Sequence, residues 1–232
     1  MSKTFTKNIL IVEDEENLGL TLQEYLENKG YNAFLAQSIK EASTLFNEHH
    51  PDVVLMDIGL PDGSGIEFAK SLREERKDFL LLFLSALNDP DTKVEALEIG
   101  AEDYITKPFA LKELTLRLEK SLQFREGLKE ETYQYGPMSI SFQKFQVVDA
   151  QNKTIDLSQK ECALLKLLHD NKGKVLSRED IIKVVWGEDK YPSNRTVDNY
   201  IVRLRKWCET DNEKHIDIQS IRGIGYKLVI KN

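Results

Sequence analysis

Short apolar runs alternate with segments of helical apolar spacing throughout residues 8–122, and this alternation limits the possible folds more than any other feature of the sequence. A short apolar run is typical of a strand buried on both faces, and apolar residues three or four positions apart are typical of a helix that covers a core. Strands that are joined by helices run parallel and are covered on both sides. The sequence therefore predicts a doubly wound parallel α/β sheet, with strands at Asn8–Val12, Tyr31–Ala36, Val53–Met56, Leu80–Leu84 and Asp103–Thr106.

The sequence pattern changes after residue 122. Residues 123–134 are mostly polar and show no apolar period, which predicts a linker between two domains. From residue 135 onward, short strands separated by turn residues are followed by Ser-x-x-Glu and Ser-x-x-Asp helix starts and by a final hairpin. We therefore expect a first domain over residues 1–122 and a small α+β domain over residues 135–232, with helices near residues 158–168, 177–187 and 195–208.

Charge is distributed unevenly along the 232 residues. Residues 1–125 hold 14 basic and 23 acidic side chains, a formal charge of −9, whereas residues 134–232 hold 17 and 13, a formal charge of +4. An acidic half joined to a basic half predicts different partners for the two domains. Cys162 and Cys208 lack metal-ligand spacing, and no apolar run is long enough to span a bilayer. These features predict a cytoplasmic protein with reduced thiols and no membrane partner.

Charged and hydroxyl side chains follow four of the predicted strands at their carboxyl ends. Glu13 and Asp14 follow the first strand, Asp57 the third, Ser85 the fourth and Lys107 the fifth. Ligands bind outside the carboxyl ends of the strands in open parallel sheets, so these side chains are expected to share one site. Each residue alone has a plainer interpretation as a turn, helix-capping or surface residue, and only their joint placement favours a functional site.

The chemistry of this set of side chains is that of phosphoryl transfer. Three carboxylates at close range repel one another unless a cation joins them, and their hard oxygens favour Mg²⁺ or Ca²⁺. An aspartate can act as a nucleophile that carries a phosphoryl group. A lysine ammonium, together with Mg²⁺, would neutralise charge on that group. The sequence therefore favours a site that handles phosphate with a divalent cation.

Residues 8–122 resemble the receiver domain of bacterial two-component response regulators. The matching motifs are ILIVEDE at residues 9–15, D-x-x-L-P-D-x-x-G at residues 57–65, LSA at residues 84–86 and GAEDYITKPF at residues 100–109. The resemblance implies a flavodoxin-like fold that a sensor histidine kinase phosphorylates on Asp57. It also implies Mg²⁺ ligands (Glu13, Asp14, Asp57 and the carbonyl of Gly59), a switch pair (Ser85 and Tyr104) and a phosphate-contacting lysine (Lys107).

A basic amphipathic segment, NRTVDNYIVRLRKWC, occupies residues 194–208. Val197, Ile201 and Leu204 form an apolar stripe, and basic or polar residues occupy the other faces. A helix of this kind after another helix and a loop suits the major groove of DNA, although the segment alone is equally consistent with an ordinary exposed helix. The RGIG turn at residues 222–225 favours DNA binding, because its arginine could reach a phosphate or the minor groove.

The second domain resembles the winged-helix output domain of the OmpR/PhoB family. The matching motifs are LSQKECALLKLL, LSREDIIKVVWG, RTVDNYIVRLRKW and SIRGIGYKL. Val202 stands where the family often has a basic residue, and the loop Glu188–Asn194 resembles a segment that some members use to contact RNA polymerase. The resemblance implies contacts with double-stranded DNA from Arg195, Thr196, Tyr200, Arg203 and Arg205 in the recognition helix and from Ser220 and Arg222 in the wing.

Together the two resemblances predict a DNA-binding transcriptional response regulator, with no enzymatic activity beyond gaining and losing its own phosphoryl group. Phosphorylation is expected to pair two receivers, so that two winged-helix domains bind tandem half-sites. The resemblance places the dimer face at Lys93, Glu98, Asp103, Glu113, Arg117 and Glu119, and Glu98 faces a second acidic residue, Glu119, where a basic partner is usual. One alternative is a constitutive transcription factor whose receiver only dimerises, and the intact acidic pair, Asp57 and Lys107 argue against it. The other is a receiver that gates an enzymatic output, and the lack of a catalytic, metal or P-loop constellation in the second domain argues against that.

Overall fold

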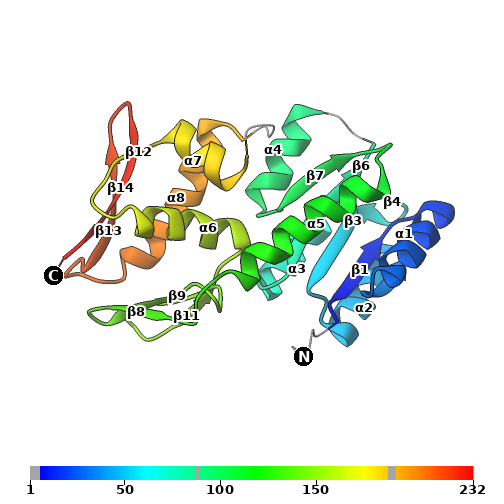
Figure 1. The fold of residues 1–232 in the computed structure, drawn as a ribbon, viewed down its shortest axis with the longest axis horizontal. Helices are drawn as coiled ribbons and strands as arrows, with labels where there is room; N and C mark the ends of the chain where they lie inside the picture. The colour runs from blue at the N-terminus through cyan, green and yellow to red at the C-terminus, as the bar shows by residue number, and fades with distance from the viewer. Residues whose placement is uncertain (1–5, 87–88, 188–191, 232) are drawn as a thin grey trace. The chain divides into compact units, whose positions relative to one another are not determined.

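The computed structural model describes residues 6–86, 89–187 and 192–231, and the chain divides into two compact units at residues 1–122 and 123–232 (Figure 1). Each unit has its own sheets and helices. No helix within these described ranges is both long enough and apolar enough to cross a membrane.

A parallel sheet forms the centre of the first unit. Its strands are β1 (Asn8–Val12), β2 (Asn32–Ala36), β3 (Val53–Asp57), β6 (Leu80–Ser85) and β7 (Asp103–Thr106). They lie in the order β2-β1-β3-β6-β7, and every pairing between them is parallel. β3 and β6 are buried along their whole length, which explains their continuous apolar sequences. The doubly wound sheet predicted from the sequence is confirmed.

Helices cover both faces of this sheet. They are α1 (Glu16–Asn28), α2 (Ile39–His49), α3 (Gly65–Glu75), α4 (Pro90–Glu98) and α5 (Leu111–Glu126). α1 and α5 bury leucines such as Leu22 and Leu114 against one face, and α2, α3 and α4 bury Phe46, Leu72 and Ala96 against the other. Full burial of a leucine or phenylalanine contributes about 1.5–3 kcal/mol, so the two apolar layers hold the rim of the sheet in place. A short hairpin, β4 (Gly59–Leu60) and β5 (Gly63–Ser64), joins β3 to α3.

The second unit begins and ends with antiparallel sheets. The first consists of β8 (Thr132–Tyr135), β9 (Met138–Ser141), β10 (Gln146–Val148) and β11 (Thr154–Asp156), in the order β11-β10-β9-β8. The second pairs β13 (Ile216–Ile221) and β12 (Leu176–Ser177) with β14 (Gly225–Ile230) in the order β12-β14-β13. We call the hairpin formed by β13, β14 and the turn between them the wing.

The helices of the second unit are α6 (Gln159–Asp170), α7 (Arg178–Val185) and α8 (Asn194–Cys208). The predicted capping box at the start of α6 is complete, because Ser158 and Glu161 exchange side-chain to backbone hydrogen bonds. Ser177 likewise accepts a hydrogen bond from the amide of Asp180. The helices followed by the wing confirm the predicted winged-helix fold.

Two segments of the second unit differ from the expectation. The expected linker of residues 123–134 overlaps both the end of α5, at Glu126, and the start of β8, at Thr132. The TYQY sequence of β8 has few apolar side chains, and it becomes a strand because its backbone pairs with β9. β12 is only two residues long and was not predicted, because it exists only through its pairing with Tyr226 and Gly225.

Candidate functional site

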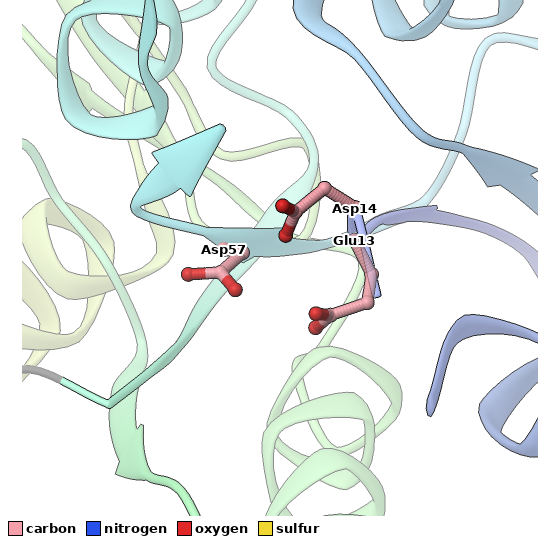
Figure 2. Close-up of side chains that lie close together, drawn as sticks. All are labelled: Glu13, Asp14 and Asp57. Atoms are coloured by element: carbon pink, nitrogen blue, oxygen red, sulfur yellow. The ribbon is translucent and has the colours of Figure 1, made fainter. Parts of the chain in front are cut away.

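The carboxyl ends of β1 and β3 bring three acidic side chains to one rim of the first sheet (Figure 2). The parallel register places Val12 opposite Met56, so the next residues along each strand, Glu13 and Asp57, are neighbours. Glu13, Asp14 and Asp57 each offer a carboxylate oxygen, and these oxygens lie within 4.8 Å of one another. The acidic side chains that the sequence places at separate strand ends therefore form one cluster.

Lys107, which follows β7, reaches into this cluster from the neighbouring part of the rim. Its Nζ donates to Oε1 of Glu13 at 2.7 Å and also to Oδ2 of Asp57. Burial alone would lower the pKa of Lys107, but the hydrogen bonds with Asp57 and Glu13 outweigh burial and raise it. The lysine is therefore a fixed positive charge between two carboxylates, and the peptide bond that follows it, to Pro108, is cis.

Glu13 shows that one ammonium group does not satisfy this cluster. Its side chain is 0% exposed, and burial raises its pKa although Lys107 opposes that shift. Oε2 of Glu13 is buried and has no hydrogen-bond partner among the described residues. A buried polar atom without a partner is costly, and hard carboxylate oxygens are the ligands that Mg²⁺ prefers. The residues present therefore fit a divalent cation.

Two glycines shape the turn beside Asp57. The amide of Gly59 donates to Oδ1 of Asp57 at 3.2 Å, and a Cβ atom added to Gly59 would meet nothing within 4 Å. A Cβ atom added to Gly65 would instead collide with the backbone carbonyl of Asp57. This role of Gly65 was not predicted, although the D-x-x-L-P-D-x-x-G motif contains the residue. Gly59 thus leaves space next to the carboxylate, and Gly65 allows the turn to pack tightly against it.

Ser85 and Tyr104 lie on adjacent strands beside the cluster. Ser85, at the end of β6, is almost fully buried, and Tyr104 on β7 is half-buried. Burial raises the pKa of Tyr104, and a side-chain hydrogen bond with Ser85 partly opposes this shift. The ammonium of Lys93 on α4 lies 5.7 Å from the centroid of the Tyr104 ring. The structure therefore brings the predicted switch pair together and places one predicted dimer-face residue against it.

Three residues of the predicted dimer face, Asp103, Glu113 and Arg117, pair with one another within the chain. Arg117 on α5 contacts Asp103 at 3.0 Å and Glu113 at 2.8 Å. A pair between two copies must therefore replace an existing pair rather than add to it. Glu98 and Glu119 are both half-buried, and the proximity of their charges across a dimer stays a prediction.

The exposed side of α8 holds only part of the predicted DNA-binding set. Arg195 and Arg203 are exposed, whereas Thr196 and Tyr200 are 0% exposed in this structure, and contacts of these two side chains with DNA stay a prediction. They extend the buried stripe of the helix, and Trp186 packs edge-on against Tyr200 with 5.2 Å between ring centroids. The buried face of α8 therefore includes residues beyond the apolar stripe that the sequence predicted.

The other predicted DNA-binding residues lie on or beside the wing. Arg222 is exposed in its turn, and Ser220 is exposed on β13. Arg205 of α8 is half-buried and turned toward the wing, because its guanidinium donates to the carbonyl of Ile218 and to Oγ of Ser220, both at 2.8 Å. Of the loop Glu188–Asn194, residues 188–191 lie outside the described residues.

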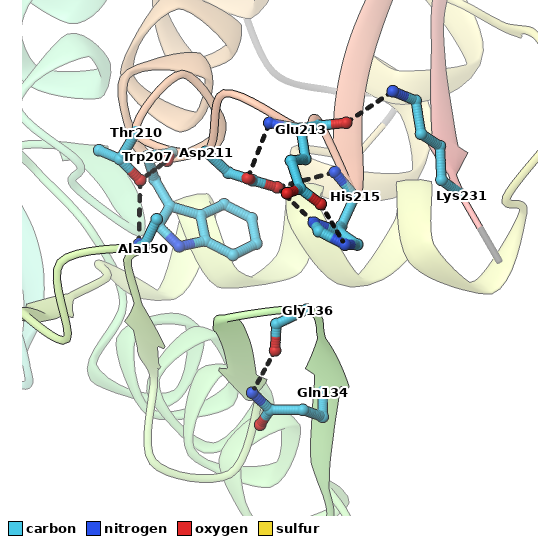
Figure 3. A network of polar contacts seen from close by, with 9 residues as sticks. All are labelled: Gln134, Gly136, Ala150, Trp207, Thr210, Asp211, Glu213, His215 and Lys231. Carbon is cyan, nitrogen blue, oxygen red and sulfur yellow. Dashed lines mark hydrogen bonds and ion pairs between the residues drawn. The ribbon is translucent and has the colours of Figure 1, made fainter.

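The loop after α8 ties the end of that helix to the rest of the second unit (Figure 3). Asp211 accepts hydrogen bonds from the amide of His215, at 2.8 Å, and from that of Glu213, at 3.0 Å, and these bonds lower the pKa of its carboxyl group. Trp207 donates from its indole to the carbonyl of Val148 at 2.9 Å. The Trp207 contact joins residues 59 positions apart and had no sequence signal, and it fixes the carboxyl end of α8 against β10.

Comparisons with known proteins agree with both halves of this description. The family model "Response regulator receiver domain" matches residues 9–119, and the model "Transcriptional regulatory protein, C terminal" matches residues 152–228.

Curated relatives resemble the chain along nearly its whole length. It is 36% identical to the transcriptional regulatory protein RprY of Bacteroides fragilis, with 95% of this chain and 94% of the relative covered. It is 34% identical to the phosphate regulon transcriptional regulatory protein PhoB of Escherichia coli, with 95% and 97% covered. Among solved structures, a RitR mutant matches with a TM-score of 0.70 at 26% identity, covering 96% of this chain and 98% of that one. The Thermotoga maritima OmpR/PhoB homologue DrrB matches with a TM-score of 0.50 at 32% identity, covering 97% and 100%.

Proposed function

The chain belongs to the OmpR/PhoB family of two-component transcriptional response regulators, and we propose that phosphorylation of Asp57 by a sensor histidine kinase switches its DNA binding. The observation that carries this proposal is the contact of Lys107 with both Asp57 and Glu13 at the rim of the sheet. An ammonium held at that point would neutralise a phosphoryl group as it arrives.

The residues of the rim divide the transfer chemistry among them. An oxygen of Asp57 forms a bond to phosphorus while the bond from phosphorus to the imidazole nitrogen of the kinase breaks, and that nitrogen keeps the electron pair. The ammonium of Lys107, which contacts the carboxylate before transfer, would contact the phosphoryl oxygens afterwards and neutralise their negative charge. Mg²⁺ would be held by Glu13, Asp14, Asp57 and the carbonyl of Gly59, and when bound it neutralises charge on the transferring group.

The switch would run through Ser85 and Tyr104. The hydroxyl of Ser85 lies at the end of β6, next to β3, where it can donate to a phosphoryl oxygen on Asp57. That donation would compete with the hydrogen bond between Ser85 and Tyr104, so phosphorylation changes what holds the tyrosine ring. Because Lys93 contacts this ring, the change reaches the face formed by α4, β7 and α5.

The output is proposed to be binding of two chains to tandem DNA half-sites. Pairing of receivers through the dimer face would raise the effective concentration of the second winged-helix domain at its half-site. Arg195 and Arg203 on α8, and Arg222 in the wing, are the exposed basic residues that support this assignment. At its promoters in the cytoplasm, the DNA-bound protein would also contact RNA polymerase.

Labelling of the full chain with acetyl phosphate tests the phosphorylation site. We expect one Mg²⁺-dependent phosphoryl group per chain, labile to hydroxylamine as an acyl phosphate is, and none in Asp57→Asn. The matched control is Asp91→Asn, which removes an exposed carboxylate from the first turn of α4 and should label like the wild type. Undiminished labelling of Asp57→Asn would show that the acceptor lies elsewhere. A wild-type chain that takes up no phosphate but binds DNA would favour the constitutive alternative.

A further inference from the structure

A polar cluster that was not predicted from the sequence joins three elements of the second unit. Asp198, on α8, accepts a hydrogen bond from Nε of Arg178 at 2.8 Å and from the hydroxyl of Tyr226 at 2.5 Å. Arg178 begins α7, Tyr226 lies on β14 of the wing, and Arg178 also donates to the Tyr226 hydroxyl at 3.1 Å. Burial alone would raise the pKa of Asp198, but these hydrogen bonds outweigh burial and lower it. The carboxylate is therefore ionised and holds a helix and a strand at once.

Contacts around this cluster extend it to the wing. The ring of Tyr226 lies 4.8 Å from the guanidinium carbon of Arg178 and 5.7 Å from that of Arg205. The amide of Arg178 donates to the carbonyl of Ile224, in the turn of the wing, at 3.4 Å. The wing is thus bound to the recognition helix α8 through the side chains of Asp198 and Arg205. It is bound to the start of α7 through both the side chain and the amide of Arg178.

We propose that Asp198 is a positioning residue for DNA binding, which fixes the wing relative to α8 so that both can contact the duplex together. The proposal rests on the proposed function of this unit as a DNA reader. A recognition helix lies in the major groove, and a wing reaches a neighbouring phosphate or groove, so their separation decides whether both contacts form. A rigid support of this kind is what a two-part binding surface needs, because a small misplacement loses one of the parts.

Because Asp198 is negatively charged, the proposal predicts a change in DNA affinity opposite to the change that charge alone predicts. A carboxylate on the recognition helix is repelled by DNA phosphates, so its replacement by asparagine should tighten binding if long-range charge alone decides. The positioning role makes the opposite prediction, since the amide of asparagine cannot bind Arg178 and Tyr226 as an ionised carboxylate does. The side chains of Asp198 and Arg178 are 44% and 24% exposed, and ion pairs this exposed add little to stability, so the variant should still fold.

The test measures DNA binding of the full chain to a duplex that carries the sequence this protein selects from a random pool. We expect Asp198→Asn to weaken binding roughly three- to tenfold, and Tyr226→Phe, which removes only the hydroxyl donor, to weaken it in the same direction. Glu209→Gln is the charge control, because it removes an exposed carboxylate just beyond α8 and should bind as tightly as the wild type or more tightly. Thermal unfolding of each variant shows that it is folded. Tighter binding by Asp198→Asn overturns the proposal.

A double-mutant cycle with Arg222→Ala then separates positioning from a direct or general effect. If Asp198 acts through the wing, replacing it should cause no further loss of DNA affinity once Arg222 no longer contacts the DNA. The losses of binding free energy from the two substitutions should then not add. Equal losses from Asp198→Asn in the presence and absence of Arg222 overturn the proposal. A wild-type chain that selects no sequence from the pool would instead contradict the proposed DNA-binding function, and the two failures are thereby distinguished.

Discussion

Replacement of Lys107 by methionine should destabilise the receiver in a pH-dependent way. Methionine keeps the length and apolar stem of lysine but removes the charge that faces Glu13, whose side chain is 0% exposed, and Asp57, whose side chain is 11% exposed. A buried charge that loses its partner costs about 3–5 kcal/mol. Glu13 can avoid part of this cost by taking up a proton, and from its ordinary pKa of 4.5 that costs about 3.4 kcal/mol at pH 7. The cost of protonating Glu13 sets an upper limit on the stability that the variant loses through this residue, so we expect a loss of about 3 kcal/mol at pH 7.

The pH dependence follows from the same protonation. The folded variant binds a proton on Glu13 that the unfolded chain releases above pH 4.5, so the stability lost in the variant grows as pH rises from 4.5 to 7. Well below pH 4.5 the folded and unfolded forms both carry the proton on Glu13, so the part of the loss that comes from Glu13 should disappear. Bound Mg²⁺ should restore stability to the variant, because it supplies positive charge at the same carboxylates.

Urea unfolding of a fragment ending at Glu126, the end of α5, would measure these changes, since single domains of this size usually unfold in one cooperative step. Lys112→Met is the matched control, because Lys112 is exposed on α5 and its loss should change stability by less than about 0.5 kcal/mol. The reasoning fails if Lys107→Met is as stable as the wild type at pH 7, or if its loss of stability is the same at pH 4.5 and pH 7.

Three other predictions follow from the structure. Gly59→Met should lengthen the lifetime of phospho-Asp57, because a side chain there would fill open space beside the carboxylate and shield the phosphoryl group from water. Timed dephosphorylation measures this lifetime, and a shorter lifetime in the variant contradicts the shielding idea. Arg203→Ala should weaken operator binding by roughly 1–3 kcal/mol and relax specificity at one position, whereas Arg222→Ala should weaken binding to all sequences and reduce its salt dependence, as titrations at several salt concentrations would show. Glu119→Lys should tighten the beryllofluoride-activated dimer by up to about 1 kcal/mol per new pair in sedimentation, and an unchanged or weaker dimer would refute the charge argument.

The sequence alone determined the architecture of both units and the rim of the first sheet. Apolar periodicity is a local property, so the parallel strands could be placed to within one or two residues. Because parallel strands end at the same edge, the acidic residues after β1 and β3 had to meet, and the structure places Glu13, Asp14 and Asp57 together. The same argument, applied to β7, predicted that Lys107 lies at this rim, where it contacts Glu13.

Only the tertiary structure decided how wide each buried face is and which charges pair. The helical period of α8 marked Val197 as buried, but it could not show that Tyr200 is covered as well, because that depends on the packing of Trp186. The cluster of Asp198 with Arg178 and Tyr226 joins residues that are 20 and 28 positions from Asp198 in the chain. Side-chain spacing reports which face a residue occupies on its own helix or strand, whereas contacts of this range depend on how separate elements pack, and no local pattern contains that information.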